Sequence, residues 1–122
     1  MLLENKNVVL AVTGGIAAFK AAEIASQLRK RGACVKCIMT QHATEFITPL
    51  TMREISGNPV AVSMFGDIPE FNVEHIALAQ WADVFVIAPA TANIIGKIAG
   101  GIADDMLSTT VMATKAPVLI AP

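Results

Sequence analysis

The chain has 122 residues, enough for one domain, and 54% of them are hydrophobic against 16% charged, which suits a sheet buried on both faces or burial between subunits. Its formal net charge of −1 gives no reason to expect a nucleic acid or an anionic membrane as partner. No apolar run reaches the roughly 18 residues of a transmembrane helix, and no basic region precedes the first apolar run, so we expect a cytoplasmic protein without a secretory signal.

The first forty residues predict two strands joined by a helix. Residues 7–12 are an apolar, β-branched run typical of a buried strand. Residues 16–31 repeat apolar side chains at helical spacing, and Gly32 is their expected stop. Residues 33–40 form the second strand, so this part predicts a right-handed βαβ unit with parallel strands.

The remaining elements follow the same alternation. Residues 41–56 have a helical pattern, but Pro49 within it predicts a kink or two short helices. A short strand at 60–64 and a mobile loop at 65–72 come next. The later pattern predicts helices at residues 73–82, 91–99 and 104–114, and strands at 84–88 and 117–121.

This alternation places the chain in the α/β class, as one domain with a Rossmann-like or flavodoxin-like doubly wound parallel sheet in a three-layer α/β/α arrangement. Parallel strands bring their carboxyl ends to one edge, where such folds bind ligands. The strands end at Thr13, Thr40, Pro89 and Pro122, so we expect the loops after them to converge on one site.

Two loops at this edge are candidate ligand contacts. Gly14 and Gly15, between a strand and a helix, either bring backbone N–H groups close to a phosphate or form a mere tight turn. The loop has neither the Walker A lysine nor the third glycine of a dinucleotide fingerprint, and no acid follows the second strand, so NAD is disfavoured. In the second loop, Thr91 and Asn93 either hydrogen-bond a flat ring or sugar-phosphate, or cap the next helix.

Four titratable candidates have competing interpretations. His75 is either a general acid–base or a structural histidine, and the backbone of His42 is expected near a ligand while its side chain is exposed. Asp104 and Asp105 favour a solvated helix cap over a metal site, and no metal is expected. Cys34 and Cys37 have CxxC spacing but lie in a strand, so we expect reduced thiols with one in the core, not a redox pair.

Several short motifs in order along the chain resemble the family of homo-oligomeric flavin-containing cysteine decarboxylases, most closely the branch acting on phosphopantothenoylcysteine. That branch is usually the N-terminal half of a bifunctional bacterial protein of coenzyme A biosynthesis. The resemblance covers essentially the whole chain, and its combination of motifs is specific although each piece is not. The motifs are residues 13–18 (TGGIAA), 73–76 (VEHI), 81–83 (WAD), 88–93 (APATAN) and 97–101 (KIAGG).

The resemblance implies a noncovalently bound FMN and a catalytic His75. The implied activity is decarboxylation of phosphopantothenoylcysteine to 4′-phosphopantetheine in coenzyme A biosynthesis, with the cysteine moiety first oxidised by FMN and the product then reduced. The implied assembly is a homotrimer or a dodecamer of trimers, with FMN at subunit boundaries. The implied cofactor contacts are Gly14, Gly15 and Ile16 at the phosphate, then Thr40, Gln41 and His42, and then Thr91, Ala92, Asn93 and Ile94.

The sequence departs from the family after its last strand. The family places a Pro-Ala-Met-Asn motif there, followed by a clamp bearing a cysteine, whereas this sequence ends at Ala121-Pro122. Cys34 and Cys37 match neither feature, so we expect a domain truncated at its C-terminal end and deficient in full turnover by itself. The alternatives are a peptidyl-cysteine decarboxylase, a flavin prenyltransferase, or a non-catalytic FMN-binding regulatory relative.

Overall fold

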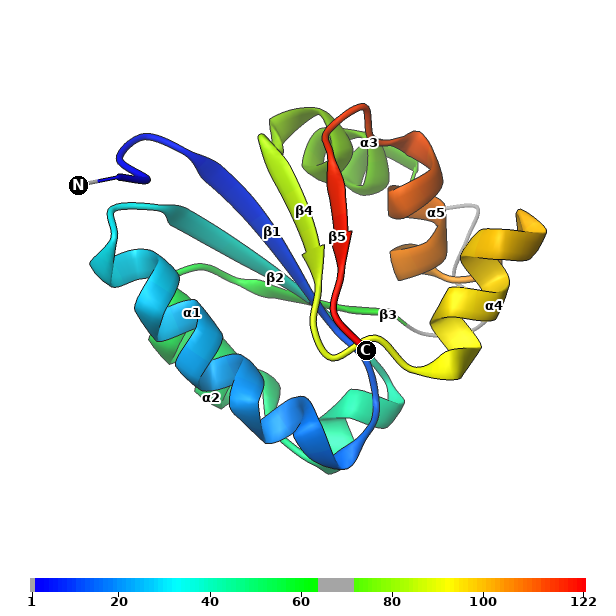
Figure 1. Ribbon diagram of the computed structural model, residues 1–122, viewed down its shortest axis with the longest axis horizontal. Coiled ribbons are helices and arrows are strands. Elements are labelled where there is room, and N and C mark those ends of the chain that lie inside the picture. The colour runs from blue at the N-terminus through cyan, green and yellow to red at the C-terminus, as the bar shows by residue number, and fades with distance from the viewer. Residues whose placement is uncertain (1, 64–71) are drawn as a thin grey trace.

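The computed structural model describes the backbone of residues 2–63 and 72–122, and the side chains of residues 2–62 and 76–122 (Figure 1). Strands and helices alternate along this backbone, as predicted. In chain order the elements are β1 (Asn7–Val12), the 3-10 turn η1 (Ile16–Lys20), α1 (Ala21–Lys30), β2 (Cys34–Thr40), the 3-10 turn η2 (His42–Glu45), α2 (Pro49–Ser56), β3 (Val60–Ser63), α3 (Asn72–Trp81), β4 (Val84–Ile87), α4 (Ala92–Gly100), α5 (Met106–Ala113) and β5 (Val118–Ile120).

The sheet has the order β3-β2-β1-β4-β5, and every pair of neighbouring strands is parallel. The chain therefore builds outward from β1 to β3 and then returns to place β4 on the other side of β1. Because the connections after β1 and β4 lead away from each other, the carboxyl ends of these two strands form the switch point at which doubly wound folds bind ligands. The predicted fold class is confirmed.

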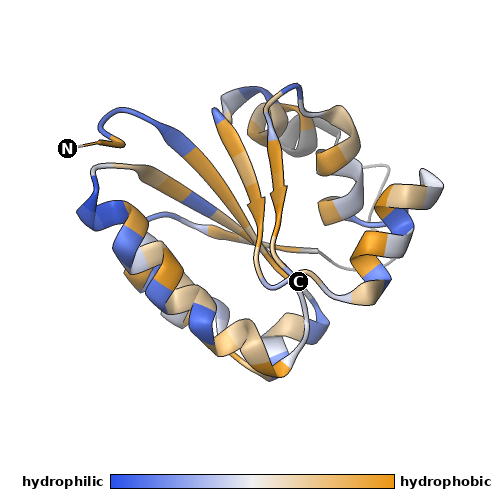
Figure 2. Cartoon of the chain, viewed as in Figure 1, coloured by the Kyte–Doolittle hydropathy of each residue, from blue (hydrophilic) through white to orange (hydrophobic). Residues whose placement is uncertain are grey.

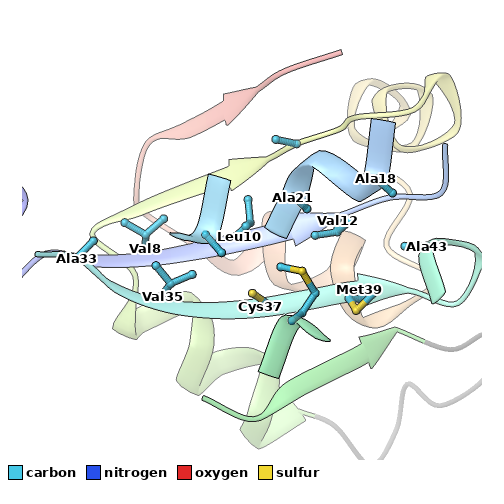
Figure 3. Packing of buried hydrophobic residues seen from close by; sticks show 13 residues of the cluster. Val8, Leu10, Val12, Ala18, Ala21, Ala33, Val35, Cys37, Met39 and Ala43 are labelled. Carbon is cyan, nitrogen blue, oxygen red and sulfur yellow. The ribbon is translucent and has the colours of Figure 1, made fainter. Parts of the chain in front are cut away.

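Helices cover both faces of the sheet, with α1 and α2 on one side and α3, α4 and α5 on the other (Figure 1). Alternation along β1 supplies both cores. Val8 and Leu10 pack under α1 and α2 (Figure 3), whereas Val9 and Ala11 pack with Leu107 of α5 on the opposite face. The central strands are apolar along their length while the helices carry polar residues as well (Figure 2), as expected for strands buried on both faces.

Two regions predicted to be helical each divide into a short 3-10 turn and an α-helix. Residues 16–31 divide into η1 and α1, and Gly32 follows with φ at 96°. The 41–56 region also divides in two, as predicted, because Thr48 accepts a hydrogen bond from Thr51 N and Pro49 occupies the first turn of α2. The expected loop at 65–72 lies outside the described residues, except that Asn72 begins α3.

The cysteine prediction is confirmed, since both thiols are free, Cys34 exposed and Cys37 buried. None of the helices in the described ranges is long and apolar enough to span a membrane.

Candidate ligand-binding site

A pocket of about 370 Å³ opens at the carboxyl ends of β1, β2 and β4, at the switch point of the sheet. Its position agrees with the edge predicted from the strand ends. Its wall combines small, hydroxyl-bearing and amide side chains with one carboxylate. The lining residues are Thr13, Gly14, Thr40, Gln41, His42, Thr91, Asn93, Ile94 and Asp105.

Gly14 brings the loop after β1 against the loop after β2. A Cβ atom built on Gly14 would lie 2.5 Å from His42 Cβ and 2.9 Å from the His42 carbonyl carbon. The requirement is steric, because Gly14 is not among the glycines with positive φ. On Gly15, by contrast, a Cβ would meet only Thr91 Cγ2, at 3.9 Å. Only Gly14 is therefore needed for the close approach of the two loops.

The helix that follows these glycines is shorter than the predicted one. Ile16 begins a 3-10 turn of 5 residues, and its N-cap Gly15 provides no side-chain hydrogen bond. The first N–H groups of such a turn have no acceptor within the helix, so they can still donate to a ligand. The predicted single α-helix, however, does not begin at this point. The side chain of Ile16 is 79% exposed, and neither Ile16 nor Gly15 lines the pocket.

Thr13 joins the two loops at the switch point. Its buried hydroxyl donates to the carbonyl of Pro89 and accepts from Thr91 N at 3.0 Å. The backbone N–H of Thr13 also donates to Pro89 O, at 3.3 Å. The Ala88–Pro89 peptide bond is cis. The threonine that directly follows β1 thus fixes the loop after β4.

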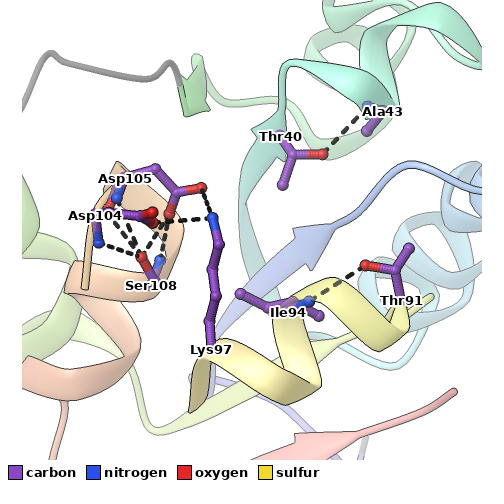
Figure 4. A network of polar contacts seen from close by, with 8 residues as sticks. All are labelled: Thr40, Ala43, Thr91, Ile94, Lys97, Asp104, Asp105 and Ser108. Carbon is purple, nitrogen blue, oxygen red and sulfur yellow. Dashed lines mark hydrogen bonds and ion pairs between the residues drawn. The ribbon is translucent and has the colours of Figure 1, made fainter. Parts of the chain in front are cut away.

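Two further threonines, one at the end of β2 and one in the loop after β4, accept hydrogen bonds from the first turns of the helical segments that follow them (Figure 4). Thr40 Oγ1 accepts from Ala43 N at 3.2 Å in η2, and Thr91 Oγ1 accepts from Ile94 N at 3.4 Å at the start of α4. The capping interpretation of Thr91 is confirmed. Both residues also line the pocket, so these hydrogen bonds to the backbone do not prevent them from contacting a ligand as well.

Asp105 is the carboxylate in the pocket wall. It caps α5 through a capping box, in which its Oδ1 accepts from Ser108 N at 2.8 Å and its own backbone N–H donates to Ser108 Oγ at 3.1 Å. Ser108 Oγ also donates to Oδ1 at 2.7 Å. Lys97 of α4 approaches Asp104 Oδ1 at 2.9 Å and Asp105 Oδ2 at 3.6 Å (Figure 4). Burial lowers the pKa of Lys97, but its hydrogen bond to Asp104 and the attraction of both carboxylates outweigh this and raise that pKa above its usual 10.5.

The prediction of a cap is thus correct, but the prediction of a solvated one is wrong for Asp105, which is only 5% exposed. The reason is the ammonium of Lys97, which offsets the cost of burying a carboxylate. The cap itself was visible in the spacing of Asp105 and Ser108. Nothing in the sequence indicated that Asp105 would reach the pocket.

His75 lies in the first turn of α3, but its side chain is outside the described residues. The last turn of α3 lies at the amino end of β1, because Asn7 Nδ2 donates to the carbonyl of Trp81 at 3.2 Å. The role of His75 stays a prediction.

Most of the predicted cofactor residues meet in this one pocket. The exceptions are Gly15, Ile16 and Ala92. His42 lines the pocket with an exposed side chain, as predicted. Within the described part of the chain, no three His, Cys, Asp or Glu side chains are grouped so as to hold a metal ion. The predicted cofactor residues that the pocket brings together are Gly14, Thr40, Gln41, His42, Thr91, Asn93 and Ile94.

Comparison with known proteins relates the whole chain to flavoproteins. The pattern that defines the Flavoprotein family matches residues 2–122. The coenzyme A biosynthesis bifunctional protein CoaBC of Vibrio cholerae is 49% identical over 120 residues, which is 98% of this chain and 30% of that protein. The CoaBC protein of Bacillus subtilis is 50% identical over 121 residues. The chain thus spans about 30% of the length of these curated relatives.

Solved structures of similar fold include cysteine decarboxylases. The FMN-dependent cysteine decarboxylase SpaF superimposes with a TM-score of 0.85 at 34% identity, covering 97% of this chain and 68% of that one. A PPC decarboxylase mutant complexed with pantothenoylaminoethenethiol gives a TM-score of 0.74 at 30% identity, covering 94% of this chain and 65% of that one.

Proposed function

The chain belongs to the Flavoprotein family, and from this premise we propose that the protein binds FMN and decarboxylates phosphopantothenoylcysteine to 4′-phosphopantetheine in coenzyme A biosynthesis. The observation that carries the proposal is the similarity, along nearly the whole chain, to CoaBC proteins of that pathway. The similarity to a PPC decarboxylase complexed with pantothenoylaminoethenethiol supports the same substrate class.

The pocket at the switch point is the proposed FMN site. Its described lining contains no lysine or arginine, so the phosphate would depend on backbone N–H groups and hydroxyls. Gly14 supports this, because its missing Cβ lets the backbone of the loop after β1 pack against the loop after β2 at the pocket wall. We propose that Gly14, Gly15 and Ile16 hold the phosphate. Further contacts are proposed from Thr40, Gln41 and His42, and from Thr91, Ala92, Asn93 and Ile94.

Bound FMN supplies a two-electron acceptor for the cysteine moiety and returns both electrons after carbon dioxide is lost, so that the overall reaction is redox-neutral. His75 is the proposed general acid–base, exchanging a proton with the cysteine moiety of the substrate. Cys34 begins β2, at the edge of the sheet opposite the pocket, and Cys37 is buried. Neither thiol is therefore assigned to the reaction.

The proposed assembly is a homotrimer, or a dodecamer of trimers, with FMN at subunit boundaries. Exposed apolar side chains on the segments that follow β1 and β2 support an interface there: Ile16, Phe19, Phe46 and Leu50. Such side chains are costly to leave in water when they are grouped on one surface. Light scattering on the purified protein measures the subunit number directly, and a monomeric mass would contradict this assembly.

The test of the function is reconstitution of the full-length protein with FMN and an assay with phosphopantothenoylcysteine. A flavin absorbance that stays with the protein through gel filtration, together with release of carbon dioxide, is the expected result. The variant His75→Asn should keep the flavin and lose activity by roughly 10²–10⁴-fold, the usual contribution of a general acid–base. A protein that takes up no flavin, or that decarboxylates only cysteine-ended peptides, would contradict the proposal.

A further inference from the structure

Asp105 carries a charge into a pocket whose other described walls are almost neutral. The ionisable side chains in the lining are His42, which is exposed, and Asp105, which is 5% exposed. Lys97 does not neutralise the carboxylate completely, because its one ammonium is shared by Asp104 and Asp105. Among the described residues of this cluster, two carboxylates share one ammonium, so negative charge is in excess beside the pocket.

The two oxygens of this carboxylate have different partners. Oδ1 accepts both hydrogen bonds from Ser108 and is engaged in capping α5. Oδ2 faces Lys97 Nζ at 3.6 Å, which is an ion pair but longer than a hydrogen bond. Lys97 therefore holds Oδ2 in place through this longer contact, and a carboxylate oxygen can accept a further hydrogen bond beside it.

We propose that Asp105 sets the direction in which the flavin lies in the pocket. Its carboxylate accepts a hydrogen bond from an uncharged N–H or O–H donor of the ligand, and its negative charge keeps the phosphate at the opposite end, beside Gly14 and Thr91. Lys97 is a positioning residue that acts through Asp105. This inference rests on the proposed FMN function and assigns to its site a residue outside the predicted contacts.

The arrangement of the pocket supports two distinct ends. In Figure 4 the Asp105 cluster and Thr91 lie on opposite sides of the view, with Lys97 between them. A phosphate next to this buried carboxylate would be repelled, because charges interact strongly where water is scarce. A donor at the same place would instead add a charge-assisted hydrogen bond to Oδ2, beside the longer contact of that oxygen with Lys97.

The test compares two ligands that differ only in the phosphate, FMN and riboflavin, on the full-length protein stripped of flavin. Asp105→Asn removes the charge and keeps the cap, because asparagine is an equally good N-cap residue. Because Ser108 N donates to the Oδ1 position, the amide oxygen of the asparagine takes that position. Its NH2 group then stands where Oδ2 was. The matched control is Asp104→Asn, which changes the charge equally and removes a partner of the same Lys97, but lies outside the pocket wall.

The expected result is a change in selectivity as well as affinity. Asp105→Asn should weaken riboflavin binding about tenfold, which corresponds to about 1.4 kcal/mol, because an acceptor for the ligand is lost. FMN binding should weaken less, because repulsion of the phosphate is relieved, so the ratio of the riboflavin Kd to the FMN Kd rises. This rise should shrink at high salt, and Asp104→Asn should keep the wild-type ratio.

Two results would overturn the inference. One is an Asp105→Asn variant that binds both flavins as the wild type does. The other is an equal loss of both ligands in both variants, which indicates a purely structural ion cluster. Circular dichroism checks that each variant is folded, and Asp105→Ser, another capping side chain, replaces any variant that is not. A wild-type protein that binds neither flavin refutes the FMN proposal itself, a result distinct from altered selectivity in a variant.

Discussion

Two adjacent glycines after β1 have different physical roles. A Cβ on Gly14 would overlap His42, whereas Gly15 has an extended backbone and a Cβ there would make only an ordinary contact with Thr91. Spacing in the sequence treats the two alike, as one glycine-rich turn. The structure distinguishes them because it places the loop after β2 against Gly14 alone.

Gly14→Ala should therefore destabilise the protein and narrow the pocket. A Cβ at 2.5 Å from that of His42 requires one of the two loops to shift, and overpacking of this kind costs about 1–3 kcal/mol. Denaturant unfolding measures the loss, and flavin titration should show weaker binding. The control is Gly96→Ala in α4, where a Cβ meets nothing within 4 Å and a gain of about 0.5–1 kcal/mol is expected. Equal stability changes in the two variants would contradict this interpretation.

Cys37 gives the protein a defined sensitivity to alkaline pH. Burial raises the pKa of its thiol from 9.0 to about 11, while a hydrogen bond with Ser56 lowers it in part. A folded-state pKa above the unfolded value means that the folded protein holds the proton more tightly. The resulting stability is fully present below about pH 9 and is lost progressively as the pH rises to about 11.

We expect the wild type to lose up to about 3 kcal/mol of unfolding free energy through Cys37 between these two pH values, at about 1.4 kcal/mol per pKa unit. Cys37→Val removes the titrating group and keeps an apolar side chain of similar size, so its stability should fall less over the same range. Cys34→Ala, at an exposed position, is the control and should follow the wild type. Parallel curves for all three proteins would show that the thiol does not contribute.

At the scale of elements, hydrogen bonds from strand-end threonines define the loops of the pocket. Thr13 connects the end of β1 with the loop between β4 and α4, and Thr40 and Thr91 cap the segments after their own strands. Helix caps follow from local sequence, and the Thr91 cap was predicted. The Thr13 contacts join residues 76 and 78 positions apart, and no local pattern indicates them.

Thr13→Val should lower stability by about 1–3 kcal/mol, because the buried Pro89 carbonyl and Thr91 N–H lose their side-chain partner. Valine has nearly the same shape as threonine, so the change isolates the hydroxyl. Thr13→Ser keeps the hydroxyl and loses a buried methyl, which costs about 1 kcal/mol. Thermal or denaturant unfolding of both variants measures the difference. A serine variant less stable than the valine variant would show that packing outweighs the hydrogen bonds.

The pattern of residues 16–31 shows a limit of periodicity at this scale. The apolar spacing is helical throughout, yet the segment begins with a 3-10 turn before α1. Such turns are frequent at helix ends, and their apolar spacing over a few residues differs little from that of an α-helix. The pattern therefore predicts that the segment is helical but not which kind of helix begins it.

At the scale of the whole molecule, the pocket is assembled from the loops after three strands together with the start of α5. Binding at this point should therefore stabilise the fold as a unit. FMN at 100 times its Kd should raise the free energy of unfolding by about 2.7 kcal/mol. Amide hydrogen exchange should slow together in the loops after β1, β2 and β4. Protection confined to one loop would place the ligand elsewhere on the molecule.

The sequence by itself determined the class of the fold, most strand bounds to within a residue, and the edge at which the site lies. These properties follow from local periodicity and from the rule that parallel strands share one carboxyl edge. Residue resemblance further indicated the family and most of the pocket lining. All of this information is carried by short segments read in order.

Only the tertiary structure decided which side chains from different segments touch. The clash that requires Gly14, the contacts of Thr13 with the loop after β4, and the burial of Asp105 beside Lys97 depend on the order of strands in the sheet and on how α4 lies against α5. Hydrophobic patterns specify which face of an element is buried but not its partner on that face. The fine structure of the pocket, including the buried charge of Asp105, is set by packing between elements.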